Sequence, residues 1–162
     1  MKMRVPTLAV AVAAIASFSD HLAMAHPTTP QPSTCSTNHP TPPWIQQKIF
    51  EDFLQKFYIK KDAKAAIQQT MAEEYIQHNP YALSGRQNAI DYIGPISEVA
   101  NFTILRHSFS NGTGWVHTKM EIPGQPLTAV MDIFRFKGTC IVEHWDVATA
   151  LPADAVNPLA LF

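Results

Sequence analysis

The part of the chain after Ala100 constrains the fold most, because it alternates apolar-rich segments with short turns. Each connection between these segments is short and contains glycine, which is typical of turns between strands. Short turns join neighbouring strands in antiparallel fashion, so we expect a meander. The four expected strands are Phe102 to Ser110, Trp115 to Ile122, Thr128 to Phe136 and Cys140 to Val147.

Two amphipathic helices are expected before these strands. Between Ile45 and Phe57 an apolar side chain recurs every four residues, and polar residues occupy the other side, which predicts a helix with one buried face. Asp62 can cap a second helix, in which Ala63, Ile67, Met71 and Tyr75 share one face.

A third helix completes the expected fold. It begins at Ser84, whose spacing to Gln87 forms a capping box, and it bends or ends at Pro95. Helices followed by strands predict an α+β fold, with three N-terminal helices packed on one face of a curved antiparallel sheet. The chain has 162 residues, which is room for one domain.

The first 25 residues have the features of a secretory signal peptide. Lys2 and Arg4 precede an apolar run from Leu8 to Phe18, and small residues flank Met24 at a suitable cleavage site. The alternative is a membrane anchor, but the run is shorter than the roughly 20 residues that span a bilayer. We therefore predict a signal peptide over 1–25, a proline-rich arm over 26–43, the domain over 44–150 and a tail over 151–162.

Other features fit export to the extracellular space. Cys35 and Cys140 are the two cysteines, and an oxidising compartment would let them pair; the alternative is two free thiols. Asn101 and Asn111 stand in Asn-x-Thr glycosylation motifs. The formal net charge is −1 without a basic block, so we expect no nucleic-acid partner. No later segment is apolar enough to span a membrane.

Two segments of the chain, Tyr75 to Pro80 and Asp132 to Val147, match a known family. They resemble the end of the second helix and the closing hairpin of the SnoaL-like polyketide cyclases, which belong to the nuclear-transport-factor-2-like superfamily. The resemblance covers the chain from Trp44 to Val147. It implies a cone-shaped fold around a pocket for a small apolar or aromatic molecule, a homodimer formed through the outer face of the sheet, and no cofactor.

The closing hairpin supplies most of the candidate site residues. Strand alternation places Asp132 and Phe134 on one face of one strand, and His144 and Asp146 on one face of the next. If Phe136 pairs with Cys140, Asp132 lies opposite His144, whereas a slip of one residue would place it opposite Glu143. The candidate catalytic residues are Asp132, Asp146, His144 and His117; the candidate ligand-binding residues are Tyr75, His78, Phe134 and Trp145.

These side chains suit the removal of a proton next to a carbonyl group. Burial disfavours the charged form of a carboxyl group, which makes it a stronger base. Either Asp132 or Asp146 would be the acid/base, assisted by His144 and His117, in a lyase or isomerase acting on a small ring-containing carbonyl compound. The alternatives are a non-catalytic binding module and a protein whose pocket is filled by its own side chains.

Two further alternatives concern Asp132 itself. It could pair with Arg135, His117 or His144 as a purely structural polar group. It could also join His117 and His144 as a set of two histidines and one carboxylate that binds a metal. We expect acid/base chemistry without a metal.

Overall fold

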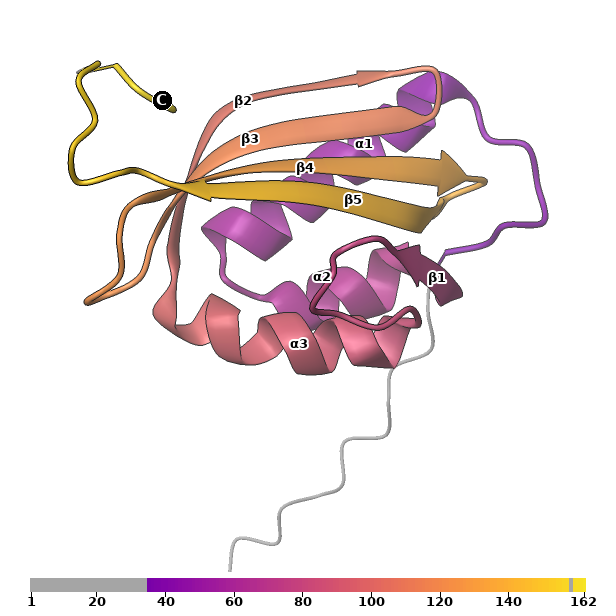
Figure 1. Cartoon of the computed structure of the whole chain (residues 1–162). Helices are drawn as coiled ribbons and strands as arrows, with labels where there is room; N and C mark the ends of the chain where they lie inside the picture. The colour runs from indigo at the N-terminus through magenta and orange to yellow at the C-terminus, as the bar shows by residue number, and fades with distance from the viewer. Residues whose placement is uncertain (1–34, 158) are drawn as a thin grey trace, which may run out of the picture.

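The structure is a computed structural model that describes residues 35–157 and 159–162. The expected signal peptide and the first half of the proline-rich arm, residues 26–34, lie outside the described residues. Three α-helices precede a four-stranded meander, as expected, and a short additional strand lies between the second and third helices (Figure 1). The helices are α1 (Pro43–Leu54), continued by the π-helical turn η1 (Gln55–Ile59), α2 (Ala63–Thr70) and α3 (Arg86–Val99).

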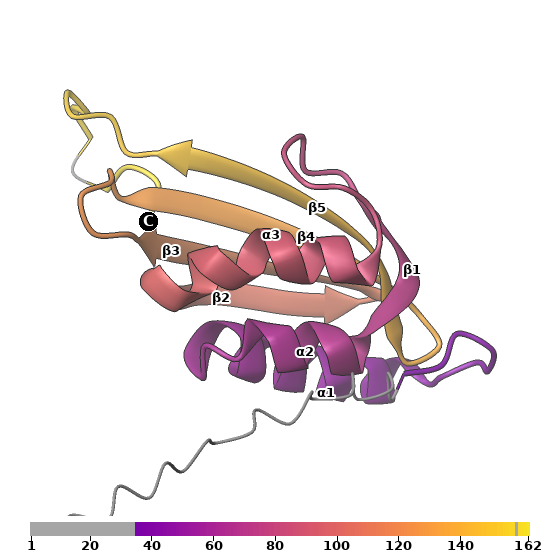
Figure 2. The ribbon, with the colours of Figure 1, turned by 90° about the horizontal axis from the view of Figure 1, so that it is seen from below.

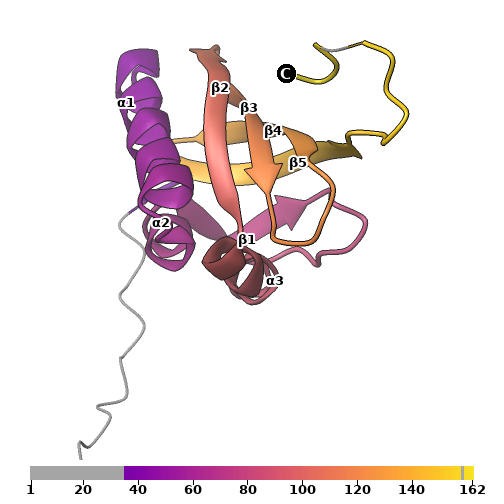
Figure 3. The same ribbon diagram turned by 90° about the vertical axis from the view of Figure 1, so that its left-hand side faces the viewer.

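The five strands form one sheet in the order β1-β5-β4-β3-β2. The meander strands pair antiparallel, and β1 pairs parallel with β5. The sheet curves around the helices, which all lie on its concave side (Figures 2 and 3). The strands are β1 (Met71–Gln77), β2 (Asn101–Ser110), β3 (Thr113–Glu121), β4 (Thr128–Lys137) and β5 (Cys140–Ala150).

The second helix is shorter than expected. It ends at Thr70, and Met71 already has extended backbone angles. Met71 and Tyr75 are both buried, but in strand β1 rather than on a helix. Residues four apart share a face in a strand as well as in a helix, so their spacing fits both structures, and pairing with β5 decides between them.

The start of the third helix also differs from expectation. Gly85 is the N-cap residue, with a φ of 102° that favours glycine. The Ser84 hydroxyl accepts a hydrogen bond from the backbone N–H of Gln77 at 3.1 Å instead of capping the helix. Pro95 lies inside the helix, which continues to Val99.

The disulfide between Cys35 and Cys140 is present and attaches the arm to the β4–β5 turn. Three hydrogen bonds reinforce the attachment. The Ser36 carbonyl accepts from the Thr139 N–H at 2.9 Å and from the Thr139 hydroxyl at 3.4 Å, and the Ser36 N–H donates to the Thr139 hydroxyl at 2.8 Å. The described part of the arm is therefore attached to the domain both covalently and by hydrogen bonds. No helix in the described part of the chain is long and apolar enough to cross a membrane.

Both candidate glycosylation residues are exposed. Asn101 begins the edge strand β2, and its side chain accepts a hydrogen bond from Lys61 at 2.6 Å. Asn111 lies in the turn between β2 and β3. Their accessibility is compatible with glycosylation, which stays a prediction.

An aromatic core holds α1 against the sheet. The fully buried Phe50 ring contacts the rings of Phe109, Phe134 and Phe136. It packs directly on Gly114 of β3, where an added Cβ would lie 2.8 Å from ring carbons. Glycine at this position therefore allows the close approach of helix and sheet.

We expect Gly114→Ala to destabilise the protein by about 1–3 kcal/mol, because the added methyl group displaces a packed ring. Urea unfolding monitored by circular dichroism measures this loss. Gly94→Ala is the matched control: nothing lies within 4 Å of a Cβ at this helical position, so the same change should be neutral or stabilise by up to about 1 kcal/mol. Equal stabilities of the two variants would contradict the role assigned to Gly114.

Candidate active site

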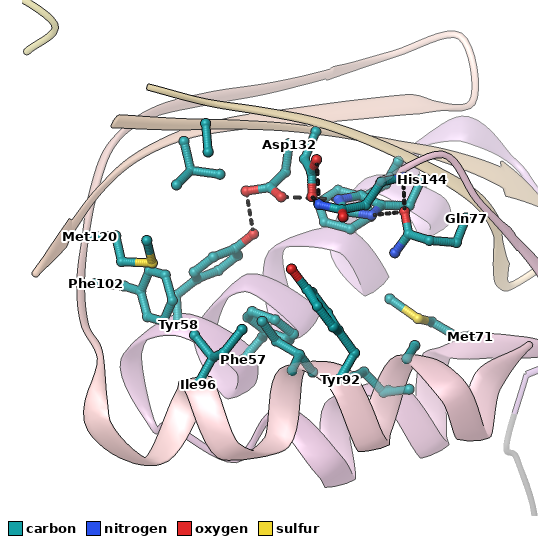
Figure 4. A pocket seen from close by; sticks show the side chains of 18 of the residues that line it. Phe57, Tyr58, Met71, Gln77, Tyr92, Ile96, Phe102, Met120, Asp132 and His144 are labelled. Carbon is teal, nitrogen blue, oxygen red and sulfur yellow. Dashed lines mark hydrogen bonds and ion pairs between the residues drawn. The ribbon is translucent and has the colours of Figure 1, made fainter. Parts of the chain in front are cut away.

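A cavity of about 200 Å³ lies between the concave face of the sheet and the helices (Figure 4). Its walls are mainly apolar, with Phe57, Met71, Ile93, Ile96, Phe102 and Phe134 among the residues that form them. All five strands, η1, α2 and α3 contribute residues. The polar side chains that line it are Tyr58, Tyr75, Gln77, Asn79, Tyr92, Asp132, His144 and Asp146.

The register of β4 and β5 brings the acidic residues and the histidine into this cavity. Asp132 lies opposite Asp146, and Phe134 lies opposite His144. The expected pairing of Asp132 with His144 is therefore wrong by two residues. The β4–β5 turn contains two residues rather than the expected three, which shifts the register by one residue. An irregularity between Arg135 and Phe136 shifts it by one more. Because a shift of two residues preserves the face, all three side chains still point inward.

Asp132 and His144 form a buried pair on the cavity wall. The His144 Nε2 atom lies 3.0 Å from Asp132 Oδ1, and each residue is 7% exposed. The other carboxylate oxygen of Asp132 accepts a hydrogen bond from the Tyr58 hydroxyl at 2.9 Å (Figure 4). The imidazole ring stacks on Phe134, with ring centroids 4.7 Å apart. Neighbours on several sides thus fix the pair.

Gln77 determines which nitrogen of His144 carries a proton. Its Oε1 atom accepts hydrogen bonds from the backbone N–H groups of His78 and Asn79, at 2.9 and 3.0 Å, which identifies that atom as the oxygen. The His144 Nδ1 atom lies 3.0 Å from the same oxygen, so it must donate and therefore bears a hydrogen. One proton remains to be shared between His144 Nε2 and Asp132. The pair can accept or release this proton without losing its orientation.

Two buried tyrosines support this arrangement. Burial and then the charge of Asp132 raise the pKa of Tyr58 well above its usual value, and the same causes raise the pKa of Tyr75. Both phenols therefore stay protonated near neutral pH. The Tyr75 oxygen accepts a hydrogen bond from Gln77 Nε2 at 2.8 Å. Its own hydrogen has no acceptor among the described residues, so Tyr75 offers the cavity a hydrogen-bond donor.

Asp146 is the second carboxylate of the cavity. The side-chain nitrogen of Asn79 contacts both of its oxygens, at 2.8 and 2.7 Å. One ligand atom from each of Asp132, His144 and Asp146 lies within 4.8 Å of the others, a spacing that a metal ion could use. Each of the three side chains is already held by a hydrogen bond, which suits proton transfer, and the absence of a metal stays a prediction.

The structure does not bring every candidate residue to the cavity. His117 is on β3, where it pairs with Met131 of β4. It lies between the buried Val116 and Thr118, so its side chain is on the outer face of the sheet. The expectation that it joins Asp132 in a catalytic or metal-binding set is therefore wrong. The inner positions of β3 are the even-numbered ones, and His117 is displaced from them by one residue.

Trp145 and His78 also lie outside the cavity. Trp145 pairs with Ile133, one position away from the inward-facing His144. Its ring stacks on His78 at 4.8 Å, and His78 Nε2 contacts Glu143 at 2.8 Å. The structure therefore does not bring these two residues to the cavity. Tyr75 and Phe134 do line the cavity, and contact with a ligand stays a prediction for both.

Sequence reasoning did not identify Tyr58, Gln77, Asn79 or Tyr92 as site residues. Gln77 and Asn79 belong to a segment that the sequence did single out, and their adjacency to His78 was the available signal. Tyr58 had no comparable signal. Phe57 and Tyr58 are consecutive and both buried, whereas the four-residue periodicity of the sequence includes Phe57 but not Tyr58. The wider π-helical turn allows both to face inward, and such turns are frequent at functional sites.

Comparison with known proteins identifies the fold. The sequence matches no protein-family model and no curated protein. Among solved structures, an NTF2-like protein of unknown function from Mesorhizobium loti has a TM-score of 0.59 and 16% identity, covering 69% of this chain and 98% of its own. A putative hydroxylase, AclR from Streptomyces galilaeus, has a TM-score of 0.54 and 10% identity, covering 67% and 91%.

A third similar structure is a putative polyketide cyclase from Acidithiobacillus ferrooxidans. It has a TM-score of 0.50 and 11% identity, and the match covers 64% of this chain and 87% of that one. At these identities the similarity establishes the fold, which is nuclear-transport-factor-2-like, as the resemblance implied. The fold hosts several chemistries, so function has to be argued from the cavity.

Proposed function

We propose that this protein is a secreted acid/base enzyme, a cofactor-free lyase or isomerase that acts on a small ring-containing carbonyl compound. The observation that carries the proposal is the buried Asp132–His144 pair, in contact at 3.0 Å on the wall of an apolar cavity. From the contact of His144 with Gln77 we infer that the pair shares one proton. A general base must lie within hydrogen-bond reach of the proton that it removes. Both members of the pair line the cavity, so a bound ligand can meet this requirement.

The proposed step is a proton transfer at the carbon next to the carbonyl. The Asp132–His144 pair takes the proton, and the electrons of the broken C–H bond form an enolate. The negative charge that develops on the carbonyl oxygen needs a hydrogen-bond donor. Tyr75 supplies one, since its hydroxyl hydrogen has no acceptor among the described residues. Return of the proton to another carbon gives isomerisation, and attack of the enolate on a second carbonyl gives an aldol product.

The neighbours of Asp132 support its role as the primary acid/base group. Tyr58 donates to the carboxylate oxygen that faces away from His144, which orients the carboxylate. Asp146 lies farther along β5, and its hydrogen-bond partner among the described residues is Asn79. Of the two candidate aspartates, Asp132 is therefore the one coupled to a proton-carrying imidazole.

Proton exchange with solvent tests this function without knowledge of the product. Small one-ring and two-ring ketones are incubated with the protein in D₂O, and loss of the α-hydrogen signal is followed by proton NMR. We expect protein-dependent exchange with at least one ketone. A ketone that binds, as shown by saturation-transfer NMR, but does not exchange its α-hydrogen would favour the alternative of a non-catalytic binding module. The mainly apolar walls of the cavity are compatible with that alternative as well.

Export and dimerisation complete the proposal. The disulfide between Cys35 and Cys140 fits an oxidising compartment. The helix-free face of the sheet carries Ile133, Trp145 and the 69% exposed Val147, an apolar surface suited to association of two copies.

We expect the mature protein to sediment as a dimer and Val147→Lys to shift it toward monomer, because a charge would be buried in the interface. Sedimentation velocity measures both. Val156→Lys is the control, since Val156 is 99% exposed in the C-terminal tail, and it should leave the dimer intact. A monomeric wild-type protein would contradict this part of the proposal.

A further inference from the structure

The charges on the cavity walls are unbalanced. The ionisable groups that line it, apart from tyrosines, are Asp132, His144 and Asp146, and the lining contains no lysine or arginine. His144 is hydrogen-bonded to Asp132, and these two residues share one proton between Nε2 and the carboxylate. Counting that proton, the pair is neutral overall. The ionised Asp146 therefore leaves the cavity with a net negative charge.

Asp146 lacks the cationic partner that several other acidic residues of the domain have. Glu143 contacts both Arg135 and His78, and Asp52 contacts Lys56. Asp146 forms no ion pair with any described residue, and its hydrogen-bond partner is the neutral amide of Asn79. A carboxylate can accept about four hydrogen bonds, so Asp146 keeps unused acceptor capacity on the cavity side.

The position of Asp146 makes this imbalance costly. It lies directly opposite Asp132 on the neighbouring strand. When the shared proton is on His144, Asp132 carries a negative charge, and like charges in that relation repel each other. A charge beside an apolar cavity is stabilised when it is paired. His144 already shares its proton with Asp132, and no lysine or arginine lines the cavity, so a cationic ligand is the available partner for Asp146.

Aromatic rings line the same cavity as this carboxylate. Tyr58, Tyr75, Tyr92 and Phe134 all line the cavity with Asp146. Burial is the largest cause of the raised pKa of Tyr92 on α3, and the charge of Asp146 is the second largest. This charge also contributes to the raised pKa of Tyr58 and of Tyr75. The field of Asp146 thus reaches across the cavity, where aromatic faces favour cations.

We propose that the ligand of this cavity is a small ring compound with a protonated amine, which pairs with Asp146 while the carbonyl side of the ligand faces Asp132 and His144. The proposal rests on the proposed function for the location of the reacting group. Oxygens of Asp132 and Asp146 lie close together on adjacent strands, so the amine and the reacting carbon are a few bonds apart. Anionic ligands are excluded by the same negative charge.

Three probes of one shape test the proposal: 2-naphthylmethylamine, 2-naphthylmethanol and 2-naphthoate. They differ mainly in charge, and isothermal titration calorimetry at pH 7 on the full mature protein gives their affinities. We expect the ammonium to bind about 10-fold more tightly than the alcohol, as for a hydrogen bond to a charged group, and the carboxylate to bind least. In Asp146→Asn the ammonium should lose this advantage, while the alcohol binds as before.

The matched control is Asp91→Asn, which removes the same charge from an exposed position on α3. It should preserve the preference for the ammonium. Equal binding of the alcohol and the ammonium to the wild type would overturn the amine proposal, and so would no detectable ammonium binding at millimolar concentration. Neither result bears on proton exchange of neutral ketones, which tests the proposed function separately.

Discussion

Asp132→Asn is expected to slow α-proton exchange of a responsive ketone by at least about 100-fold, the lower end of the contribution of general acid–base catalysis. Asparagine has nearly the same shape and can still contact Tyr58 and His144. It cannot hold the proton that Asp132 and His144 share, so the chemistry is lost while the packing is retained. Exchange rates measured by NMR under identical conditions give the ratio, and circular dichroism verifies the fold.

Two further variants serve as controls for the effect of Asp132→Asn on the exchange rate. Asp91→Asn, at an exposed position where the carboxylate accepts a hydrogen bond from Gln87, should exchange at the wild-type rate. Tyr58→Phe removes one hydrogen bond from Asp132 Oδ2, and we expect a loss of about 10-fold, as for one hydrogen bond to a charged group. If Asp132→Asn exchanged as fast as the wild type, the base would have to be sought elsewhere in the cavity.

The form of His144 can be measured independently of any substrate. Its Nδ1 atom faces the Gln77 oxygen, which also accepts two backbone N–H groups. Long-range ¹H–¹⁵N NMR should therefore show a protonated Nδ1, whatever the state of Nε2. In Gln77→Leu this preference should disappear, because the acceptor is gone. An unprotonated Nδ1 in the wild type would contradict the shared-proton arrangement.

The strands of the meander could be predicted from the sequence because local and long-range signals agree there. Glycine turns separate segments whose alternation matches the burial that the structure shows: Gly114, Val116 and Thr118 are the buried positions of β3. The same alternation places Asp132 and His144 on inner faces, and it survives an error of two residues in register. A register error of one residue would have moved every side chain to the opposite face.

The rest of the site depends on information that a local pattern does not contain. His117 is a candidate because it belongs to the second expected strand and has a suitable side chain, but its buried neighbours Val116 and Thr118 show that it faces outward. The strand β1 exists because β5 is available to pair with it, and this pairing is a property of the tertiary structure. It brings Gln77 next to His144, which explains why the residue that sets the histidine tautomer was missed.

The arm and the domain are joined by the covalent bond that the two cysteines predicted. Cys35 and Cys140 are separated by 105 residues, so the disulfide removes a large part of the conformational freedom of the unfolded chain. In the loop-entropy description a closed loop of about 100 residues contributes about 4.7 kcal/mol. In the folded state Ser36 and Thr139 form three hydrogen bonds beside the disulfide, which hold the two cysteines near each other.

Replacing Cys35 by serine and the buried Cys140 by alanine is expected to lower the free energy of unfolding by about 3–4 kcal/mol. For a domain of this size the Tm should fall by roughly 10 °C, as measured by calorimetry. Wild-type protein kept in reductant should approach the same value, which separates loss of the bond from loss of side-chain packing. Thr139→Val is the matched control: it removes the Ser36 hydrogen bond to the hydroxyl but leaves the disulfide, so the expected loss is only about 1 kcal/mol. A Tm unchanged by both reduction and the double substitution would show that the arm contributes nothing to the stability of the fold.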